Sequence, residues 1–131
     1  MPPYLHKRHF TVDEARAVLK SIKPKIEEML QLRARLTELN YDIYKHAYFG
    51  GRGPNGSRYH PDELESLVKI LREFELKGVL VKSIEEGLID FPYIRESGEE
   101  VYLCWKIGEE DIDYWHSIAD GFQGRKPIGH L

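Results

Sequence analysis

A long amphipathic stripe constrains the fold of this 131-residue chain more than any other sequence feature. Thr11 and Glu14 have the spacing of a capping box, which predicts that a helix begins directly after Thr11. Apolar residues then recur at helical spacing over roughly 30 residues, namely Ala15, Leu19, Ile22, Ile26, Met29, Leu36 and Ile43. Pro24 predicts a kink or a short break in this helix, which we expect to continue to about Ala47.

A helix of this length projects beyond a small domain unless something covers its apolar face. One cover is a second copy of the chain, which predicts a homodimer formed through the long helix. The other cover is the second helix of the same chain, and the sequence leaves both open. Arg33 and Asn40 interrupt the seven-residue repeat, so an antiparallel or bundle arrangement is favoured over a long parallel coiled coil.

A second helix and a small sheet follow in the sequence. Pro61 and the acidic residues after it favour a helix start, and Gly78 marks the end of that helix. Three β-like runs then predict an antiparallel meander, over residues 79–82, 88–94 and 101–107. Alternation in the third run predicts the residues that face the core, namely Val101, Leu103, Trp105 and Ile107.

The C-terminal part of the chain is less regular. Pro92, in the second predicted strand, cannot donate to a β-ladder and is expected at an edge or a bulge. Acidic residues from residue 109 onward predict a short helix, which an irregular tail follows. The predicted fold is α+β, with a long kinked N-terminal helix and a second helix packed on a three-stranded antiparallel sheet. We expect a single domain over residues 1–131, divided into a mobile basic arm (1–9), a helical part (10–78) and a β-meander with its tail (79–131).

Charge is divided unevenly along the chain, although the net charge is only −3. Residues 1–60 carry eleven Lys or Arg against six Asp or Glu, whereas residues 61–131 carry eight against sixteen. The acidic half repels phosphates, so we expect no nucleic-acid partner. These acids form either a solvated face or a binding surface, and a partner that binds the sheet end is expected to be a basic protein. No apolar run has the length of a membrane span, and the start lacks the apolar stretch of a signal peptide. We therefore expect a cytoplasmic protein that makes no membrane contact.

Several motifs in the C-terminal half occur in fixed order: Gly87-Leu88-Ile89-Asp90-Phe91-Pro92, Val101-Tyr102-Leu103-Cys104-Trp105, Gly108-Glu109, Trp115-His116 and Gly121-Phe122-x-Gly124-Arg125-x-Pro127. With Phe10-Thr11-x-x-Glu14-Ala15, they make residues 10–128 resemble an uncharacterised prokaryotic family, the domain of unknown function 2203. Lys126 stands where that family is expected to have Gln, and Ile89 stands where Val is usual. The family has no established activity, so the resemblance implies only a small, intracellular, single-domain protein.

Five residues in or near these motifs are candidates for a ligand-binding site: Asp90, Trp105, Trp115, His116 and Arg125. Arg125 can bind an anion through two hydrogen bonds, His116 can exchange protons near neutral pH, and Asp90 can orient either of them. The same side chains could instead tie the tail to the sheet. Cys104, in the middle of a strand, fits a small packed hydrophobe.

The sequence has no recognisable motif for catalysis, a cofactor or a metal. Its histidines show no ligand spacing such as H-x-x-x-H, and the glycine-rich run at residues 51–56 lacks the preceding strand of a dinucleotide-binding loop. We therefore interpret the protein as a non-enzymatic protein-interaction or scaffold module that self-associates through its long helix, with no cofactor and no metal. The alternative is a small-molecule or anion-binding protein, or an enzyme, with a site formed by Asp90, His116 and Arg125.

Overall fold

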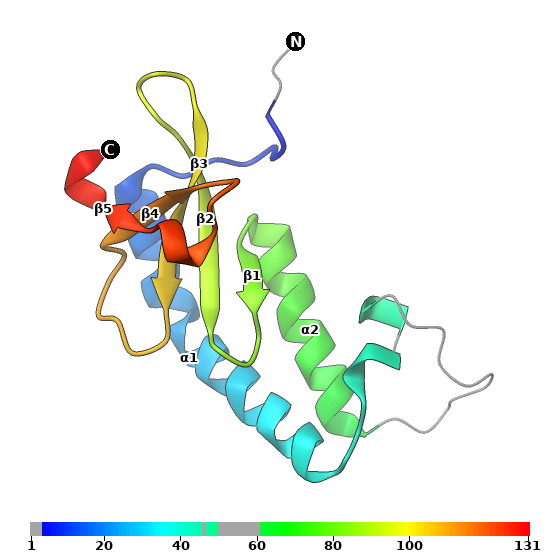
Figure 1. Ribbon diagram of the computed structural model, residues 1–131. Helices are drawn as coiled ribbons and strands as arrows, with labels where there is room; N and C mark the ends of the chain where they lie inside the picture. Colours follow the sequence, from blue (N-terminus) through cyan, green and yellow to red (C-terminus); the bar gives the residue numbers. More distant parts are fainter. Residues whose placement is uncertain (1–3, 46, 50–60) are drawn as a thin grey trace.

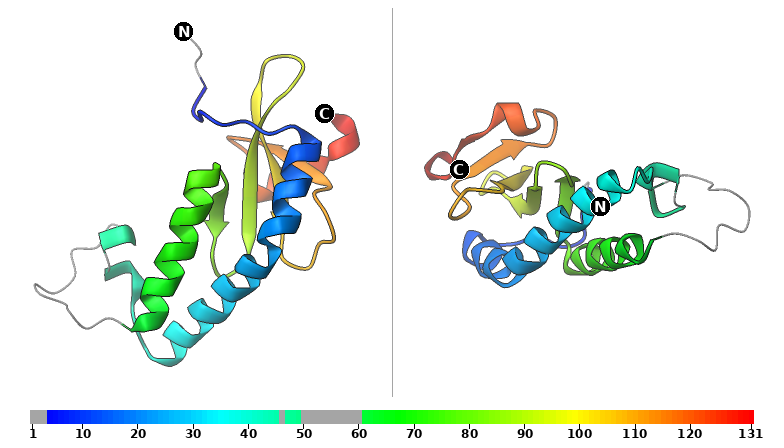
Figure 2. Two further views of the ribbon diagram at one scale, coloured as in Figure 1. Left: turned by 180° about the vertical axis from the view of Figure 1, so that it is seen from behind. Right: turned by 90° about the horizontal axis from the view of Figure 1, so that it is seen from below.

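The computed structural model describes residues 4–45, 47–49 and 61–131. The fold is α+β, as predicted: two α-helices of the described residues pack against one face of an antiparallel sheet (Figures 1 and 2). The sheet has five strands, in the order β1-β2-β3-β4-β5, so the prediction of three strands is wrong. The glycine-rich run at residues 51–56 lies outside the described residues. No helix in the described part of the chain has both the length and the apolar character needed to cross a membrane.

The first helix, α1 (Val12–Glu38), begins at the predicted capping box. The Glu14 amide donates to Thr11 Oγ1 (3.0 Å), and the Thr11 amide donates to Glu14 Oε1 (2.8 Å). The helix runs through Pro24 without a break, and no kink is shown. The predicted continuation to Ala47 is wrong, because Asn40 adopts a left-handed backbone conformation (φ 55°) that ends the helix. Two short 3₁₀ turns follow, η1 (Ile43–Lys45) and η2 (Ala47–Phe49).

The second helix, α2 (Asp62–Lys77), covers much of the apolar face of α1 within the same chain. It ends at Gly78, whose φ of 81° is the left-handed conformation expected of a helix-terminating glycine. The buried residues of α1 are those of the predicted stripe: Ala15, Leu19, Ile22, Ile26, Met29 and Leu36. The sequence allowed either a second copy of the chain or the second helix of the same chain to cover this apolar face. In the structure, α2 of the same chain covers it.

The sheet comprises β1 (Leu80–Ser83), β2 (Leu88–Ile94), β3 (Glu100–Lys106), β4 (Tyr114–Ser117) and β5 (Lys126–Pro127). The first three strands confirm the predicted meander. The short helix predicted from residue 109 is wrong, because residues 114–117 pair with β3 instead. Trp115 then faces the helices and joins the core, whereas His116 faces the opposite side of the sheet.

Two details of the sheet refine the expectations for individual residues. Val101, Leu103 and Trp105 are buried in the core as predicted, but Ile107 lies beyond the end of β3 and is 37% exposed. Pro92 lies past the end of β1, where β2 is locally an edge, in agreement with its missing amide. At that edge the Pro92 carbonyl accepts a hydrogen bond from the Phe10 amide (2.8 Å).

Candidate metal centre

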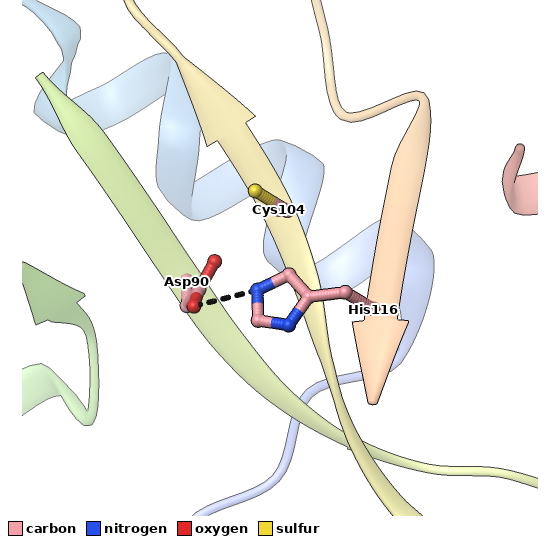
Figure 3. Close-up of side chains that lie close together, drawn as sticks. All are labelled: Asp90, Cys104 and His116. Atoms are coloured by element: carbon pink, nitrogen blue, oxygen red, sulfur yellow. Dashed lines mark hydrogen bonds and ion pairs between the residues drawn. The ribbon is translucent and has the colours of Figure 1, made fainter. Parts of the chain in front are cut away.

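The face of the sheet turned away from the helices carries a buried polar cluster, formed by Asp90 of β2, Cys104 of β3 and His116 of β4 (Figure 3). Asp90 and Cys104 are direct partners across the two strands, and His116 pairs with Tyr102, two residues along β3. The three residues are 1%, 0% and 3% exposed, respectively. One oxygen, sulfur or nitrogen atom from each residue lies within 4.8 Å of the other two.

The hydrogen bonds of His116 define where its protons lie. Nδ1 lies 2.8 Å from the Ser117 carbonyl oxygen, and Nε2 lies 3.0 Å from Oδ2 of Asp90 (Figure 3). A carbonyl oxygen only accepts, so Nδ1 carries a proton, and the bond between Nε2 and Asp90 holds another. Burial lowers the pKa of His116, but the hydrogen bond and charge of Asp90, together with the Ser117 carbonyl, outweigh it and raise that pKa. These interactions favour a protonated His116 next to Asp90 when no ligand is bound.

The other two polar atoms of the cluster are Oδ1 of Asp90 and the sulfur of Cys104. Oδ1 of Asp90 is buried and accepts no hydrogen bond from any described residue. An unsatisfied buried carboxylate oxygen is unusual in a folded protein, because its desolvation is not compensated. Burial and the nearby Asp90 carboxylate raise the pKa of the Cys104 thiol, so this cysteine is neutral in the absence of a ligand.

Arg125 is anchored by a different carboxylate from the one considered in the sequence. Its Nη2 donates to both oxygens of Glu109, at 2.8 and 2.7 Å. The guanidinium also lies 4.0 Å from the centroid of the Tyr114 ring and 4.6 Å from that of Phe122. The structure thus joins Asp90 to His116 by a hydrogen bond, and fixes Arg125 to Glu109 in the tail.

The two tryptophans lie on the other side of the sheet from the cluster. Neighbouring residues of a strand point to opposite faces, so Trp105 and Trp115 face the helical core while Cys104 and His116 face away from it. Trp105 donates from Nε1 to the Glu109 carbonyl oxygen (2.9 Å). The two tryptophans therefore pack in the core and hold β3, β4 and the loop after β3 in place. Neither tryptophan is part of the polar cluster.

The cluster has the donor set of a single-ion metal site, with one donor atom of each residue within 4.8 Å of the others. Zn²⁺ binds cysteine sulfur at about 2.3 Å and histidine nitrogen or carboxylate oxygen at about 2.0–2.2 Å, which places donors on one tetrahedral ion roughly 3.3–3.6 Å apart. Nε2 of His116 and Oδ2 of Asp90 are 3.0 Å apart, so small side-chain shifts would fit an ion. The bond from Nδ1 to a backbone carbonyl is the support usually found behind a metal-binding histidine.

The role of Cys104 in this cluster could not be found from local spacing. The three donors come from three different strands and lie 14 and 12 positions apart in sequence. The sequence could predict this cluster only if residues 114–117 were first recognised as a strand paired with β3. Alternation along the strands then places Asp90, Cys104 and His116 on one face of the sheet.

Comparisons with known proteins identify the family but no characterised relative. No curated protein matches the chain. No solved structure matches it either. The model of one family, described as an uncharacterized conserved protein (DUF2203), matches residues 8–128. Because this match covers nearly the whole chain and agrees with the resemblance seen in its motifs, the protein belongs to the DUF2203 family.

Proposed function

We propose that this protein binds one divalent transition-metal ion through Asp90, Cys104 and His116. The observation that carries the proposal is the buried Oδ1 of Asp90, which has no hydrogen-bond partner among the described residues. A metal ion bound by both oxygens of the Asp90 carboxylate would satisfy Oδ1 and would replace the proton between Oδ2 and Nε2 of His116. The thiolate of Cys104 and the carboxylate of Asp90 would together neutralise the charge of the ion.

The donor set favours a particular class of metal. Mg²⁺ and Ca²⁺ prefer oxygen ligands and rarely accept a thiolate or an imidazole. One sulfur, one nitrogen and one oxygen donor suit Zn²⁺ and its neighbours among the transition metals. Three protein ligands leave the fourth position of a tetrahedral ion for water or another small ligand. The proposal assigns a binding site and no reaction.

Cobalt spectroscopy tests the proposal, because Co²⁺ occupies zinc sites and reports its ligands. Cys104 is the only cysteine, so a charge-transfer band from thiolate to cobalt has one source. We expect this band, with the strong visible absorption of tetrahedral Co²⁺, on addition of one equivalent of Co²⁺. Cys104→Ser should lose the band, and His130→Gln, which changes an exposed histidine, should keep it. A purely octahedral spectrum of the unmodified protein would mean that Asp90 and His116 form only a structural ion pair.

Self-association as a scaffold or interaction module remains a second, separate prediction. The stripe on α1 that motivated it is buried within the chain, so that stripe does not by itself require a second copy. Light scattering at micromolar concentration tests it: a dimer mass supports self-association, and the 15.3 kDa mass of a monomer contradicts it. The expected basic partner also remains a prediction, although several acids of the sheet end, such as Glu99 and Glu109, are already paired with arginines.

A further inference from the structure

Residues 4–9, which belong to the segment expected to form a mobile arm, are held in the structure chiefly by one side chain. Glu100, at the start of β3, accepts hydrogen bonds from the amides of Leu5 (2.8 Å) and His6 (3.1 Å) and from Nε2 of His9 (2.7 Å). The Tyr4 hydroxyl adds a bond to the Gly98 carbonyl (3.3 Å). Figure 1 shows this segment, in dark blue, passing close to the end of the β2–β3 hairpin.

The Glu100 anchor is buried and strongly hydrogen-bonded. Its side chain is only 7% exposed, so water cannot replace the three donors without a local opening of the structure. Burial alone would raise the pKa of Glu100, but its bonds with His9, Leu5 and His6 outweigh burial and lower that pKa. The carboxylate is therefore ionised at neutral pH and binds the segment through charge-assisted hydrogen bonds.

The same segment is connected to the Asp90–Cys104–His116 cluster through one aromatic residue. Nε2 of His6 lies 2.6 Å from the Tyr102 hydroxyl, and the two rings are 5.4 Å apart. The Tyr102 ring in turn meets the His116 ring in a T-shaped contact with centroids 5.5 Å apart. Nζ of Lys82 lies 4.4 Å from the centre of the Tyr102 ring. Tyr102 thus contacts both His6 of the segment and His116 of the cluster, and Lys82 lies over its ring.

We infer that residues 4–9 are a strap that controls access to the Asp90–Cys104–His116 cluster. This inference rests on the proposed function, because its purpose is to admit and retain the metal ion. The three ligands are 0–3% exposed, so an ion reaches them only when part of the surrounding structure opens. The strap is held chiefly by one carboxylate, whereas β2, β3 and β4 are held by full ladders and a packed core. Opening of the strap is therefore a local motion of lower cost than opening of these three strands.

Cys104 provides a test that does not require a metal. In the metal-free protein, a small thiol reagent modifies Cys104 only when the structure opens around it. Glu100→Ala removes the acceptor of all three strap bonds, and we expect it to accelerate modification at least about tenfold, the effect of one lost hydrogen bond to a charged group. Glu99→Ala is the matched control, since it removes a neighbouring acid that binds Arg95 and no strap residue. Its rate should stay within about twofold of the unmodified protein.

A second variant tests whether faster modification comes from release of the strap and not from another effect of removing the Glu100 carboxylate. His6→Pro keeps the carboxylate but removes both the His6 amide donor and the imidazole bonded to Tyr102, and it should also accelerate modification. Urea unfolding of each variant gives its global stability. The strap is refuted if neither variant reacts faster, or if the acceleration equals the change in the global unfolding constant. Faster modification in a protein that binds no Co²⁺ would support the strap and refute the metal proposal.

Discussion

Replacing His116 by leucine should lower the free energy of unfolding of the metal-free protein by about 3–5 kcal/mol. Removal of the imidazole leaves the Asp90 carboxylate buried without its histidine partner. Urea unfolding monitored by tryptophan fluorescence measures the effect, because Trp105 and Trp115 are buried in the core. His130→Leu, at an exposed position, is the control and should change stability by less than about 0.5 kcal/mol.

The double variant Asp90→Leu/His116→Leu separates the cost of leaving a buried charge unpaired from the cost of changing the side chains at these two positions. Replacing both partners of a buried ion pair by apolar residues is often neutral or stabilising, because no charge then remains without a partner. We therefore expect the double variant to recover most of the stability that His116→Leu loses. A double variant as unstable as the single one would show that the pair itself stabilises the fold. A single variant of unchanged stability would contradict the buried, charge-paired state of Asp90.

Local signals in the sequence were sufficient for most of the fold. The capping box at Thr11, the glycine at residue 78 and the alternation in β3 each describe a few neighbouring residues, and the predictions from them agree with the structure except at Ile107, which lies beyond the end of β3. β4 was missed because its four residues gain their structure from pairing with β3, and this pairing depends on residues distant in sequence. The end of α1 was placed too late because apolar spacing continues to Ile43, whereas Asn40 turns the backbone out of the helix.

The candidate site was predictable only in part, for the same reason. Asp90 and His116 were selected as residue types able to form a site, and they are hydrogen-bonded in the structure. Arg125 was grouped with them, but its carboxylate partner in the structure is Glu109, which follows β3. Cys104 was interpreted as a packed hydrophobe, and its burial fits that interpretation, yet the strand register also places it beside Asp90.

Loss of the Cys104 sulfur should have the largest effect on metal affinity. Changes to residues that merely support metal ligands typically weaken binding by about 10–100-fold. Cys104→Ser removes a ligand itself, and serine oxygen is a poor donor to Zn²⁺, so we expect zinc affinity to fall by more than about 100-fold. The serine differs from cysteine in one atom, so the sheet around it should keep its fold. Histidine and carboxylate alone would then have to hold the ion.

Equilibrium dialysis against Zn²⁺, followed by metal analysis of the protein, tests the central claim most directly. The unmodified protein and His130→Gln should each retain one zinc ion per chain, and Cys104→Ser should retain little at the lowest zinc concentration that saturates them. An unmodified protein that retains no zinc would contradict the assignment of Asp90, Cys104 and His116 as a metal centre. Equal retention by Cys104→Ser would contradict it as well.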